Sequence, residues 1–337
     1  MTTTQWGVLG TGKIARTLLT AIGEAENAEA VFIASRDPEK ARIMADEFGV
    51  ARAGTYDELL QDGEVEAVYN SFPNSLHPEW SIKCARAKKH ILCEKPLSLY
   101  TSRVEEMFQV AREEGVLAME AFMFRFHPQW PRLQQILDEG AIGKVRLLRS
   151  AFSFCMDDFN DARFSTEMEG GALSDVGTYC VNYSRTVAKM TNPNAVPVAV
   201  FAQAQFHQNK TENVDEVLSG VIRFSDGLLA QFFCGLRAGY IGDTEVFGEG
   251  GVVKLPNPWF GSEEGEIIVN GAKIEFPGAK NYVLEVEHFS NAIQNKLTME
   301  ELFLTPQDSI MNVRVLEALL QSAREGREVA VEDSRLR

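Results

Sequence analysis

A glycine-rich turn near the amino terminus constrains the fold of this chain more than any other feature of its sequence. The turn reads Gly10-Thr11-Gly12-Lys13-Ile14-Ala15, follows the apolar run at residues 6–9 and opens an amphipathic helical pattern. In this context the first glycine permits a tight turn, the second lets a pyrophosphate approach the backbone, and the small third residue allows the helix to pack on the strand. A plain glycine turn between two ordinary elements is the alternative. The order of strand, turn and helix favours a phosphate site at the helix N-terminus.

The remainder of the first third alternates short apolar runs with helical patterns. The runs cover residues 30–34, 67–72, 91–93 and 116–119, and Asp37-Pro38 is typical of the start of a helix that ends near Gly49. This rhythm predicts βαβ units and a parallel sheet. We therefore expect an α/β Rossmann dinucleotide-binding domain at residues 1–121.

After about residue 122 the pattern changes to longer strand-like stretches, at residues 145–154, 196–206, 217–224 and 228–236. Turns such as Ser225-Asp226-Gly227 separate them, which favours an antiparallel or mixed sheet. Helical patterns occur at residues 128–139, 171–190, 282–295 and 306–325. Since 337 residues are about twice the usual length of a domain, we expect a second, α+β domain at residues 122–337 for substrate binding and oligomerisation.

Charge and cysteine spacing exclude several classes of protein. The 33 lysines and arginines stand against 48 aspartates and glutamates, a net charge of −15, which disfavours nucleic acid and anionic membranes as partners. The cysteines (Cys84, Cys93, Cys155, Cys180 and Cys234) show no C-x-x-C spacing, so neither a disulfide framework nor a zinc site is expected. No signal-peptide pattern and no membrane-length apolar run is present. A cytoplasmic protein without a metal is predicted.

The residue that meets the adenosine ribose normally lies about 20 positions after the glycine turn, which here is Ser35. An acid at this place suits NAD, whereas the hydroxyl of Ser35 and the guanidinium of Arg36 suit the 2′-phosphate of NADP. Asp37 would reach the ribose after a shift of one or two residues, but it also serves as a helix N-cap. Arg36 as a plain surface charge is the other alternative. We expect NADP(H) to be preferred, with NAD(H) possible.

Two distant stretches carry candidate catalytic residues. Glu94-Lys95-Pro96 follows a predicted parallel strand, at the sheet edge where α/β proteins bind ligands. Gly170-Gly171 leads, four residues later, to Asp175, and Tyr179 follows after four more, which would put both side chains on one helical face. Alternatively, Lys95 is an ordinary strand-end charge, and Asp175 and Tyr179 are a dipole-favouring residue and a core aromatic.

Together these residues resemble the glucose–fructose oxidoreductase/inositol dehydrogenase (Gfo/Idh/MocA) family of NAD(P)-dependent oxidoreductases. The resemblance covers nearly the whole chain and rests on motifs in family order, namely Gly10 to Ala15, Pro73-Asn74-Ser75-Leu76-His77, Glu94-Lys95-Pro96, Glu120 to Pro128 and Gly170 to Tyr179. Tyr179 stands where the inositol dehydrogenase branch has histidine. This tyrosine is similar to the branch that contains dimeric dihydrodiol dehydrogenase and NADP-dependent aldose (xylose or glucose) 1-dehydrogenases.

The resemblance implies which residues contact the cofactor and the substrate. The residues implied for the cofactor are Gly10, Thr11, Gly12, Lys13, Ile14, Ser35, Arg36, Ser71, Pro73, Asn74, His77, Glu94, Lys95 and Pro96. Arg125, Asp175 and Tyr179 are implied for the substrate, a Lys95-Pro96 cis peptide bond is implied as in relatives, and the second domain is expected to carry a large, mostly antiparallel sheet. An interdomain salt bridge is the alternative role of Arg125.

Hydride transfer between a carbinol and nicotinamide requires a group that takes or gives the hydroxyl proton. Tyr179 is our candidate, because the ammonium of Lys95 would stabilise a phenolate whose unperturbed pKa is about 10. Lys95 would also polarise the developing carbonyl, and Asp175 would orient Lys95 or bind a sugar hydroxyl.

The expected function is NADP-dependent oxidation or reduction of a sugar or related polyhydroxylated compound, with aldose 1-dehydrogenation favoured. A keto-sugar or dihydrodiol oxidoreductase, or a non-catalytic NAD(P)-binding regulator, are the alternatives. A homodimer is expected, because a sheet with one exposed apolar face commonly pairs through it.

Three further features have a structural explanation beside the functional one. His77 either lines the cofactor pocket or starts a helix with bonds to nearby backbone. His127 either faces the cleft or is packed. Phe122, Phe124 and Phe126 have period two, which predicts a strand with one buried face.

Overall fold

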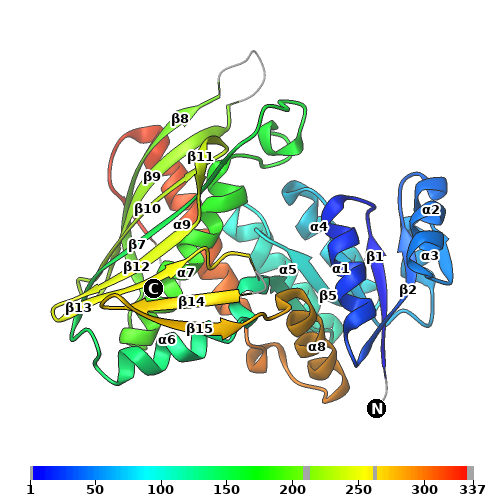
Figure 1. The fold of residues 1–337 in the computed structure, drawn as a ribbon. Helices are drawn as coiled ribbons and strands as arrows, with labels where there is room; N and C mark the ends of the chain where they lie inside the picture. Colours follow the sequence, from blue (N-terminus) through cyan, green and yellow to red (C-terminus); the bar gives the residue numbers. More distant parts are fainter. Residues whose placement is uncertain (1–2, 208–212, 261–263, 332–337) are drawn as a thin grey trace. The chain divides into compact units, whose positions relative to one another are not determined.

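The computed structural model describes residues 3–207, 213–260 and 264–331 (Figure 1). Its contacts divide the chain into two compact units, residues 1–126 with 280–310, and residues 127–279 with 311–337. The domain boundary after residue 121 stays a prediction.

The first unit contains, in its described part, a parallel sheet of six strands in the order β3-β2-β1-β4-β5-β6. Helices alternate with these strands along the chain, as the apolar runs predicted. The elements are β1 (Thr4–Leu9), α1 (Lys13–Glu24), β2 (Ala28–Ala34), α2 (Pro38–Phe48), β3 (Arg52–Gly54), α3 (Tyr56–Gln61), β4 (Ala67–Asn70), η1 (Asn74–Leu76), α4 (His77–Arg86), β5 (His90–Glu94), α5 (Thr101–Glu114) and β6 (Ala118–Ala121). This strand order is that of a dinucleotide-binding Rossmann sheet, so the predicted fold class of the first part is confirmed.

Local sequence explains why these elements form where they do. Trp6, Val8 and Leu9 of β1 are fully buried, as expected of a parallel strand covered on both faces. The Asp37 carboxylate accepts the Glu39 N–H at 3.1 Å and caps α2, and Gly49 ends this helix in the left-handed conformation. The predicted bounds of this helix are confirmed.

A later segment completes the core of the first unit. Helix α8 (Asn281–Gln294) and the short helix η5 (Met299–Glu301) belong to it. The Trp6 indole N–H donates to Ser290 Oγ at 3.1 Å, and the ring lies 5.8 Å from that of Phe289. The first strand is therefore anchored to a helix that lies almost 300 residues further along the chain.

The strand predicted from the aromatic repeat at Phe122, Phe124 and Phe126 is wrong. Residues Met123–Phe126 form the 3₁₀ helix η2. Phe122 and Phe124 are fully buried, and the Phe126 ring lies 5.2 Å from that of Phe303. The three rings find packing partners in a 3₁₀ helix, so the period of two in the sequence does not require a strand here.

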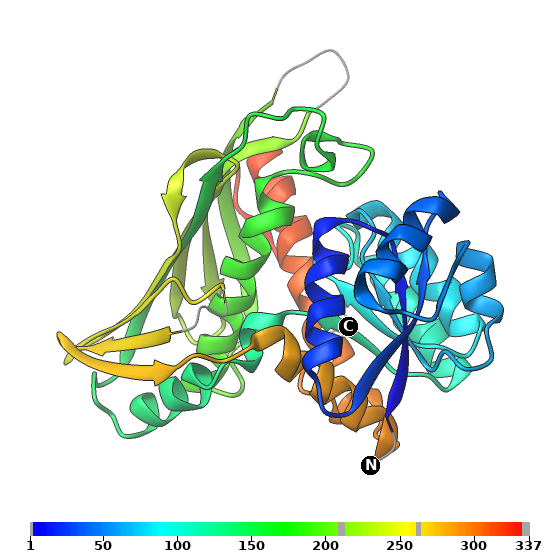
Figure 2. The ribbon, with the colours of Figure 1, turned by 45° about the vertical axis from the view of Figure 1, so that its right-hand side comes forward.

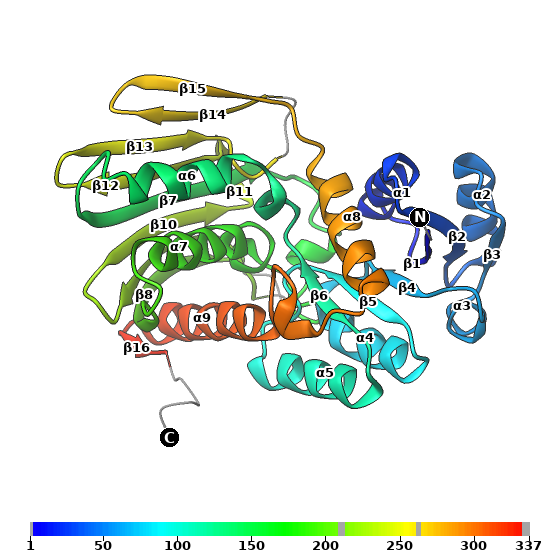
Figure 3. The same cartoon turned by 90° about the horizontal axis from the view of Figure 1, so that it is seen from below.

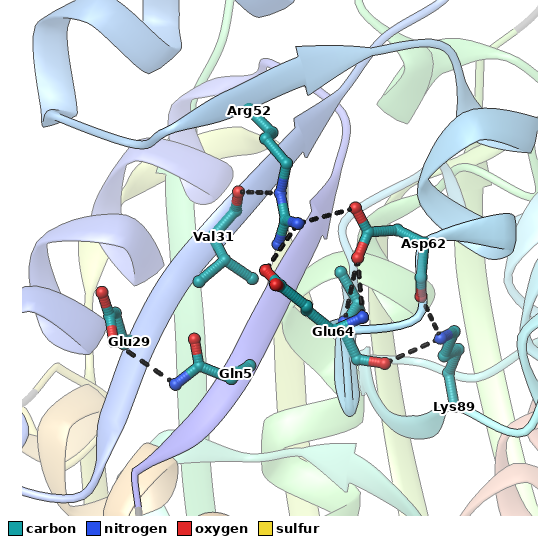
Figure 4. Close-up of polar contacts among 8 residues, drawn as sticks. Gln5, Glu29, Val31, Arg52, Asp62, Glu64 and Lys89 are labelled. Atoms are coloured by element: carbon teal, nitrogen blue, oxygen red, sulfur yellow. Dashed lines mark hydrogen bonds and ion pairs between the residues drawn. The ribbon is translucent and has the colours of Figure 1, made fainter.

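Polar side chains form a network where the strands of the first unit begin (Figure 4). Arg52 pairs with Asp62 at 3.1 Å and with Glu64 at 2.6 Å, and Lys89 Nζ donates to the carbonyls of Asp62 at 2.6 Å and Val65 at 2.7 Å. These contacts tie the loops before β4 and β5 together. They lie at the opposite ends of the strands from Gly10, Ser35 and Lys95, so they stabilise the sheet without entering the predicted cofactor edge.

The second unit contains a mixed sheet of ten strands in its described part, in the order β15-β14-β13-β12-β7-β10-β9-β8-β16, with β11 paired to β7. Strands β7 and β10 are parallel and the other pairs are antiparallel. The elements are α6 (Gln129–Asp138), β7 (Val145–Cys155), η3 (Ala162–Phe164), η4 (Leu173–Gly177), α7 (Thr178–Thr191), β8 (Pro197–Phe206), β9 (Asp215–Phe224), β10 (Leu229–Gly235), β11 (Arg237–Ile241), β12 (Asp243–Gly248), β13 (Gly251–Pro256), β14 (Glu264–Val269), β15 (Ala272–Pro277), α9 (Pro306–Glu325, which begins in the first unit) and β16 (Val329–Ala330). The predicted large, mostly antiparallel sheet is confirmed.

Helices cover one face of this second sheet. Figures 2 and 3 show α7 and α9 on the same face, and α7 contacts β7 and β10. Leu148, Ile222 and Phe232 point to this covered face and are buried. Among the described residues, no helix lies on the other face (Figure 2).

The five cysteines are free, and all except Cys155 are buried. Within the described ranges, none of the helices has both the length and the apolar character required to cross a membrane, and no group of three or more potential metal-ligating side chains occurs there. The cytoplasmic location predicted from cysteine spacing stays a prediction.

His77 connects the turns that follow β4 and β5. Its Nδ1 lies 2.8 Å from the Pro96 carbonyl oxygen and its Nε2 lies 2.6 Å from the Phe72 carbonyl oxygen. The side chain is buried, as in the alternative of a helix-start histidine bonded to nearby backbone. Burial lowers the pKa of His77 to about 4, and the charge of Lys95 adds to this effect, although both carbonyl groups favour the charged ring.

We expect His77→Gln, which replaces the ring by a polar side chain of similar size, to make the free energy of unfolding less dependent on pH at acid pH. Between about pH 6.5 and 4 the unfolded chain binds a proton at His77 and the folded chain does not, so stability falls as the pH falls. Relative to the variant, the wild type should lose on the order of 3 kcal/mol over this window. Urea unfolding at a series of pH values measures this difference. His90→Gln serves as a comparison that should give a smaller change in the same direction, because burial also lowers the pKa of His90. A wild type that gains stability over the variant on acidification would show a charged ring instead.

Candidate functional site

The turn after β1 has the backbone shape of a phosphate cradle. Gly10 has φ of 103°, its N–H donates to the Ala34 carbonyl at 2.9 Å, and a Cβ there would lie 2.8 Å from Ser71 Oγ. A Cβ at Gly12, by contrast, would meet nothing within 4 Å. Among the described residues, no side chain caps the N-terminus of α1, which begins at Lys13. A helix start with free space beside it suits an anionic group.

The residues after β2 fit their predicted positions. Ser35 is buried, and its Oγ accepts the Asp37 N–H at 3.2 Å. Asp37 acts as the cap of α2, so its carboxylate already has a backbone partner. Arg36 is exposed directly after the carboxyl end of β2. This leaves the Arg36 guanidinium available for a phosphate at this edge of the sheet.

Glu94, Lys95 and Pro96 follow β5 with their backbone held on several sides. The Lys95–Pro96 peptide bond is cis, as expected. The Glu94 carboxylate accepts a hydrogen bond from the Tyr69 hydroxyl and another from the Lys95 N–H at 3.2 Å. The Leu97 N–H donates to buried Glu120 at 3.3 Å. Together with the His77 contact to Pro96, these bonds fix the backbone of Lys95.

Sequence reasoning missed an acidic cluster around Glu94. Glu285 of α8 is 0% exposed, and burial, together with the charge of Glu94, raises its pKa well above the usual range. Burial and then Glu94 likewise raise the pKa values of Tyr69 and Tyr282. No local signal could have indicated this cluster, because α8 lies almost 190 residues after β5.

Pro73 and Asn74 lie at the turn after β4. Pro73 precedes η1, and its carbonyl accepts the Leu76 N–H at 2.9 Å. Ser71 Oγ donates to the Leu9 carbonyl at 2.6 Å, which joins this turn to the end of β1. Ser71, Pro73 and His77 therefore surround the same edge of the sheet as the glycine turn.

In the second unit, Asp175 lies in a π-helical turn, η4, that runs directly into α7. The predicted helix at residues 171–190 is present, but its first part is wider than an α-helix, so the simple four-residue face is not kept there. The Tyr179 ring lies in an aromatic cluster, 5.4 Å from Phe152 and 6.0 Å from Trp259 between ring centroids. This packing fixes the direction of the Tyr179 side chain.

Arg163 is a second residue that sequence reasoning missed. Its Nε donates to Asp175 Oδ2 at 2.7 Å, and its Nη1 pairs with Asp161 at 3.2 Å. The charge of Asp175 raises the pKa of Arg163. Arg163 lies in a loop with no motif of its own, so only the fold assigns it as the partner of Asp175.

Arg125 and His127 have partners within their own units. Arg125 pairs with Asp308 at 3.9 Å, and its guanidinium carbon lies 5.2 Å from the Phe303 ring centroid. This ion pair has both partners in the first unit, so it is not the interdomain salt bridge that was the alternative role of Arg125. His127 is buried and its Nδ1 accepts the Gln129 N–H at 3.1 Å, as expected of a packed histidine.

The candidate residues thus form two groups. The first unit brings together the glycine turn, Ser71, His77 and the cis Lys95–Pro96 bond at one sheet edge. The second unit brings together Asp175, Arg163 and the helix that carries Tyr179. The meeting of Lys95 with Tyr179, and the role of each residue in binding or catalysis, stay predictions.

Comparison with known proteins places this arrangement in a family. Residues 4–122 match the family described as "Oxidoreductase family, NAD-binding Rossmann fold" (GFO_IDH_MocA), and residues 130–254 match the "GFO/IDH/MocA C-terminal domain". A trans-1,2-dihydrobenzene-1,2-diol dehydrogenase of Mus musculus is 30% identical over 81% of this chain and 80% of its own. A D-xylose 1-dehydrogenase (NADP(+)) of Haloferax volcanii is 30% identical over 97% of this chain and 99% of its own.

A solved structure agrees over almost the full length. It is KijD10, a 3-ketoreductase from Actinomadura kijaniata in complex with NADP and TDP-benzene, which is 27% identical, covers 95% of this chain and 98% of its own, and superposes with a TM-score of 0.86. The predicted family and its branch are confirmed by these relatives. The chain belongs to the GFO/IDH/MocA family of oxidoreductases.

Proposed function

We propose that this protein is an NADP-dependent oxidoreductase that acts on a CH–OH or carbonyl carbon of a sugar, with aldose 1-dehydrogenation as the favoured reaction. The observation that carries the proposal is that the backbone beside Lys95 and the side chains of Asp175 and Tyr179 are held by contacts within their own units. The chain is also 30% identical to a D-xylose 1-dehydrogenase (NADP(+)) over 97% of its length.

The residues present fit a bound dinucleotide. The uncapped start of α1 beside Gly12 would hold the pyrophosphate, and the exposed Arg36 would meet a 2′-phosphate. Bound NADP would supply or accept the hydride. All other steps fall to side chains of this chain.

In the direction of aldose oxidation, the anomeric carbon loses a hydride and its hydroxyl loses a proton, so a lactone forms. Tyr179 as phenolate takes that proton at its oxygen, and an ammonium at Lys95 stabilises the phenolate. Lys95 also hydrogen-bonds the substrate oxygen as it becomes a carbonyl. Asp175, held by Arg163, binds a neighbouring sugar hydroxyl. Reduction of a carbonyl uses the same groups in reverse.

Reduction of a keto-sugar is a second candidate, favoured by the structural match to a 3-ketoreductase, and oxidation of a dihydrodiol is a third, favoured by the murine relative. All three need the same proton donor or acceptor. Initial rates of NADPH formation with aldoses and dihydrodiols, and of NADPH consumption with keto-sugars, separate the three reactions.

A homodimer is part of the proposal. The sheet face without helices carries exposed Phe201 (39%) and Leu229 (40%) and a hollow of about 610 Å³ lined by, among others, Phe233 and Gln231. The hollow is lined by apolar side chains together with charged ones such as Arg149 and Glu245. A broad sheet face that exposes apolar side chains suits a second copy of the same face.

Light scattering should give twice the chain mass. Phe233→Glu should give a monomer and Ile43→Glu, an exposed apolar position in the first unit, should not; a wild-type monomer contradicts the proposal.

Tyr179→Phe should lower kcat by about 10²- to 10⁴-fold, the usual contribution of a general acid or base, and leave the Kd for NADP nearly unchanged. Tyr183→Phe is the matched control, because it removes a buried hydroxyl one turn further along α7 that donates to the Glu245 carbonyl. Steady-state kinetics and NADP titration measure both variants. Equal kcat in Tyr179→Phe and wild type would refute the assigned role.

Arg36→Ala should weaken binding of NADP by about tenfold or more, since a charge-assisted bond to the 2′-phosphate is lost, and should change NAD binding little. Arg42→Ala is the control, because Arg42 is exposed on α2 and already pairs with Glu39 and Asp46. Fluorescence titration with both dinucleotides gives the ratio. An unchanged preference in Arg36→Ala would mean that another residue meets the phosphate.

A further inference from the structure

The turn at Gly170 and Gly171 is tightly packed against another backbone segment of the second unit. The Gly170 N–H donates to the Ser165 carbonyl at 2.9 Å and the Gly171 N–H donates to the Arg163 carbonyl at 2.8 Å. A Cβ at Gly170 would overlap the carbonyl group of Arg163. The turn is therefore joined directly to the segment that presents the Arg163 side chain.

Asp215, the first residue of β9, packs against the other side of this turn. It is 2% exposed, and its Oδ2 accepts the Leu173 N–H at 2.6 Å. A Cβ at Gly171 would overlap Asp215 Oδ1, and φ of 120° at Gly171 disfavours any side chain there. The second glycine is thus required by the close approach of a buried carboxylate.

This contact sets the start of the helix that carries the candidate site. Leu173 begins η4, Asp175 lies two residues later, and α7 with Tyr179 follows without a break. Arg163, which holds Asp175, accepts the Gly171 N–H with its carbonyl group. A displacement of the turn would therefore move both partners of the ion pair between Asp175 and Arg163.

Charged and titratable groups from several elements surround Asp215. The charge of Arg324 of α9 favours the carboxylate form of Asp215. Burial, and then the charges of Asp215 and Asp175, raise the pKa of Cys234 of β10. His207 and Glu216, next to it in the sheet, pair with each other at 2.8 Å. Burial raises the pKa of Asp215 to about 7, although the N–H groups of Leu173 and Asp215 and the charge of Arg324 favour the carboxylate.

We propose that Asp215 is a positioning residue that aligns Tyr179 and the pair of Asp175 and Arg163, and that only its carboxylate form holds this alignment fully. A carboxylate accepts a stronger hydrogen bond from the Leu173 N–H than a neutral carboxyl group does. The effect on turnover rests on the proposed function, whereas the effect on the turn does not.

Asp215→Asn tests the proposal, because it keeps the size of the side chain and its acceptor oxygen but removes the charge. Near pH 6 the wild type and the variant should have similar kcat/KM. Near pH 8 the wild type should exceed the variant about fivefold to tenfold, the loss expected when a charge-assisted hydrogen bond becomes a neutral one. The Kd for NADP should stay within about twofold, since Asp215 lies outside the dinucleotide unit.

Hydrogen exchange gives a readout that is independent of turnover. At about pH 8 the amides of residues 171–177 should exchange faster in Asp215→Asn than in the wild type, because the bond to the Leu173 N–H is weaker. If no substrate is turned over by the wild type, the proposed function fails, and this measurement still tests the positioning role.

Asp226→Asn is the matched control, because Asp226 accepts the Leu228 N–H at 3.1 Å at the other, exposed end of β9. It should change neither the pH profile nor the exchange of residues 171–177. Gly171→Ala disturbs the same contact, because its Cβ would overlap Asp215 Oδ1. This variant should have a lower kcat/KM at every pH and an unchanged affinity for NADP. A wild-type to Asp215→Asn ratio that is flat with pH, or unchanged exchange in that variant, would overturn the proposal.

Discussion

The parallel register of β1, β4 and β5 is the constraint on which the first half of the candidate site depends. Because the three strands run in one direction, their carboxyl ends meet at one edge, and the glycine turn, the turn at Ser71 and the Lys95–Pro96 bond lie there together. His77 then joins two of these turns through their carbonyl groups. The polar network of Arg52, Asp62 and Lys89 holds the opposite edge. The predicted cofactor site and the stabilising polar network therefore lie at opposite ends of the strands.

The second half depends on charge pairing rather than on strand register. Asp175 has Arg163 as its partner, and the turn before it is held by Asp215. The aromatic rings of Phe152 and Trp259 then fix Tyr179 by packing. A phenol held in this way would lose little conformational freedom on binding a substrate, which the proposed proton transfer requires.

In the proposed function the two halves would divide the tasks of a dehydrogenase. The first unit would supply the dinucleotide site and the ammonium of Lys95, and the second unit would supply the proton donor or acceptor and the contacts that select a substrate. The relatives described above are a D-xylose 1-dehydrogenase, a trans-1,2-dihydrobenzene-1,2-diol dehydrogenase and a 3-ketoreductase, so the family supports several reactions.

Local sequence by itself determined the elements whose signals are local: the glycine turn, the cap at Asp37, the end of α2 at Gly49, the alternation that builds the parallel sheet, and the motifs that indicate the family. Tertiary structure decided the rest. It turned the aromatic repeat at residues 122–126 into a 3₁₀ helix, placed Ser290 against Trp6, and brought Arg163 and Asp215 to the segment before Tyr179. The physical reason is that hydrogen bonds and ion pairs between residues tens to hundreds of positions apart leave no periodic trace in either segment, and they form only when the sheets bring the two segments into contact.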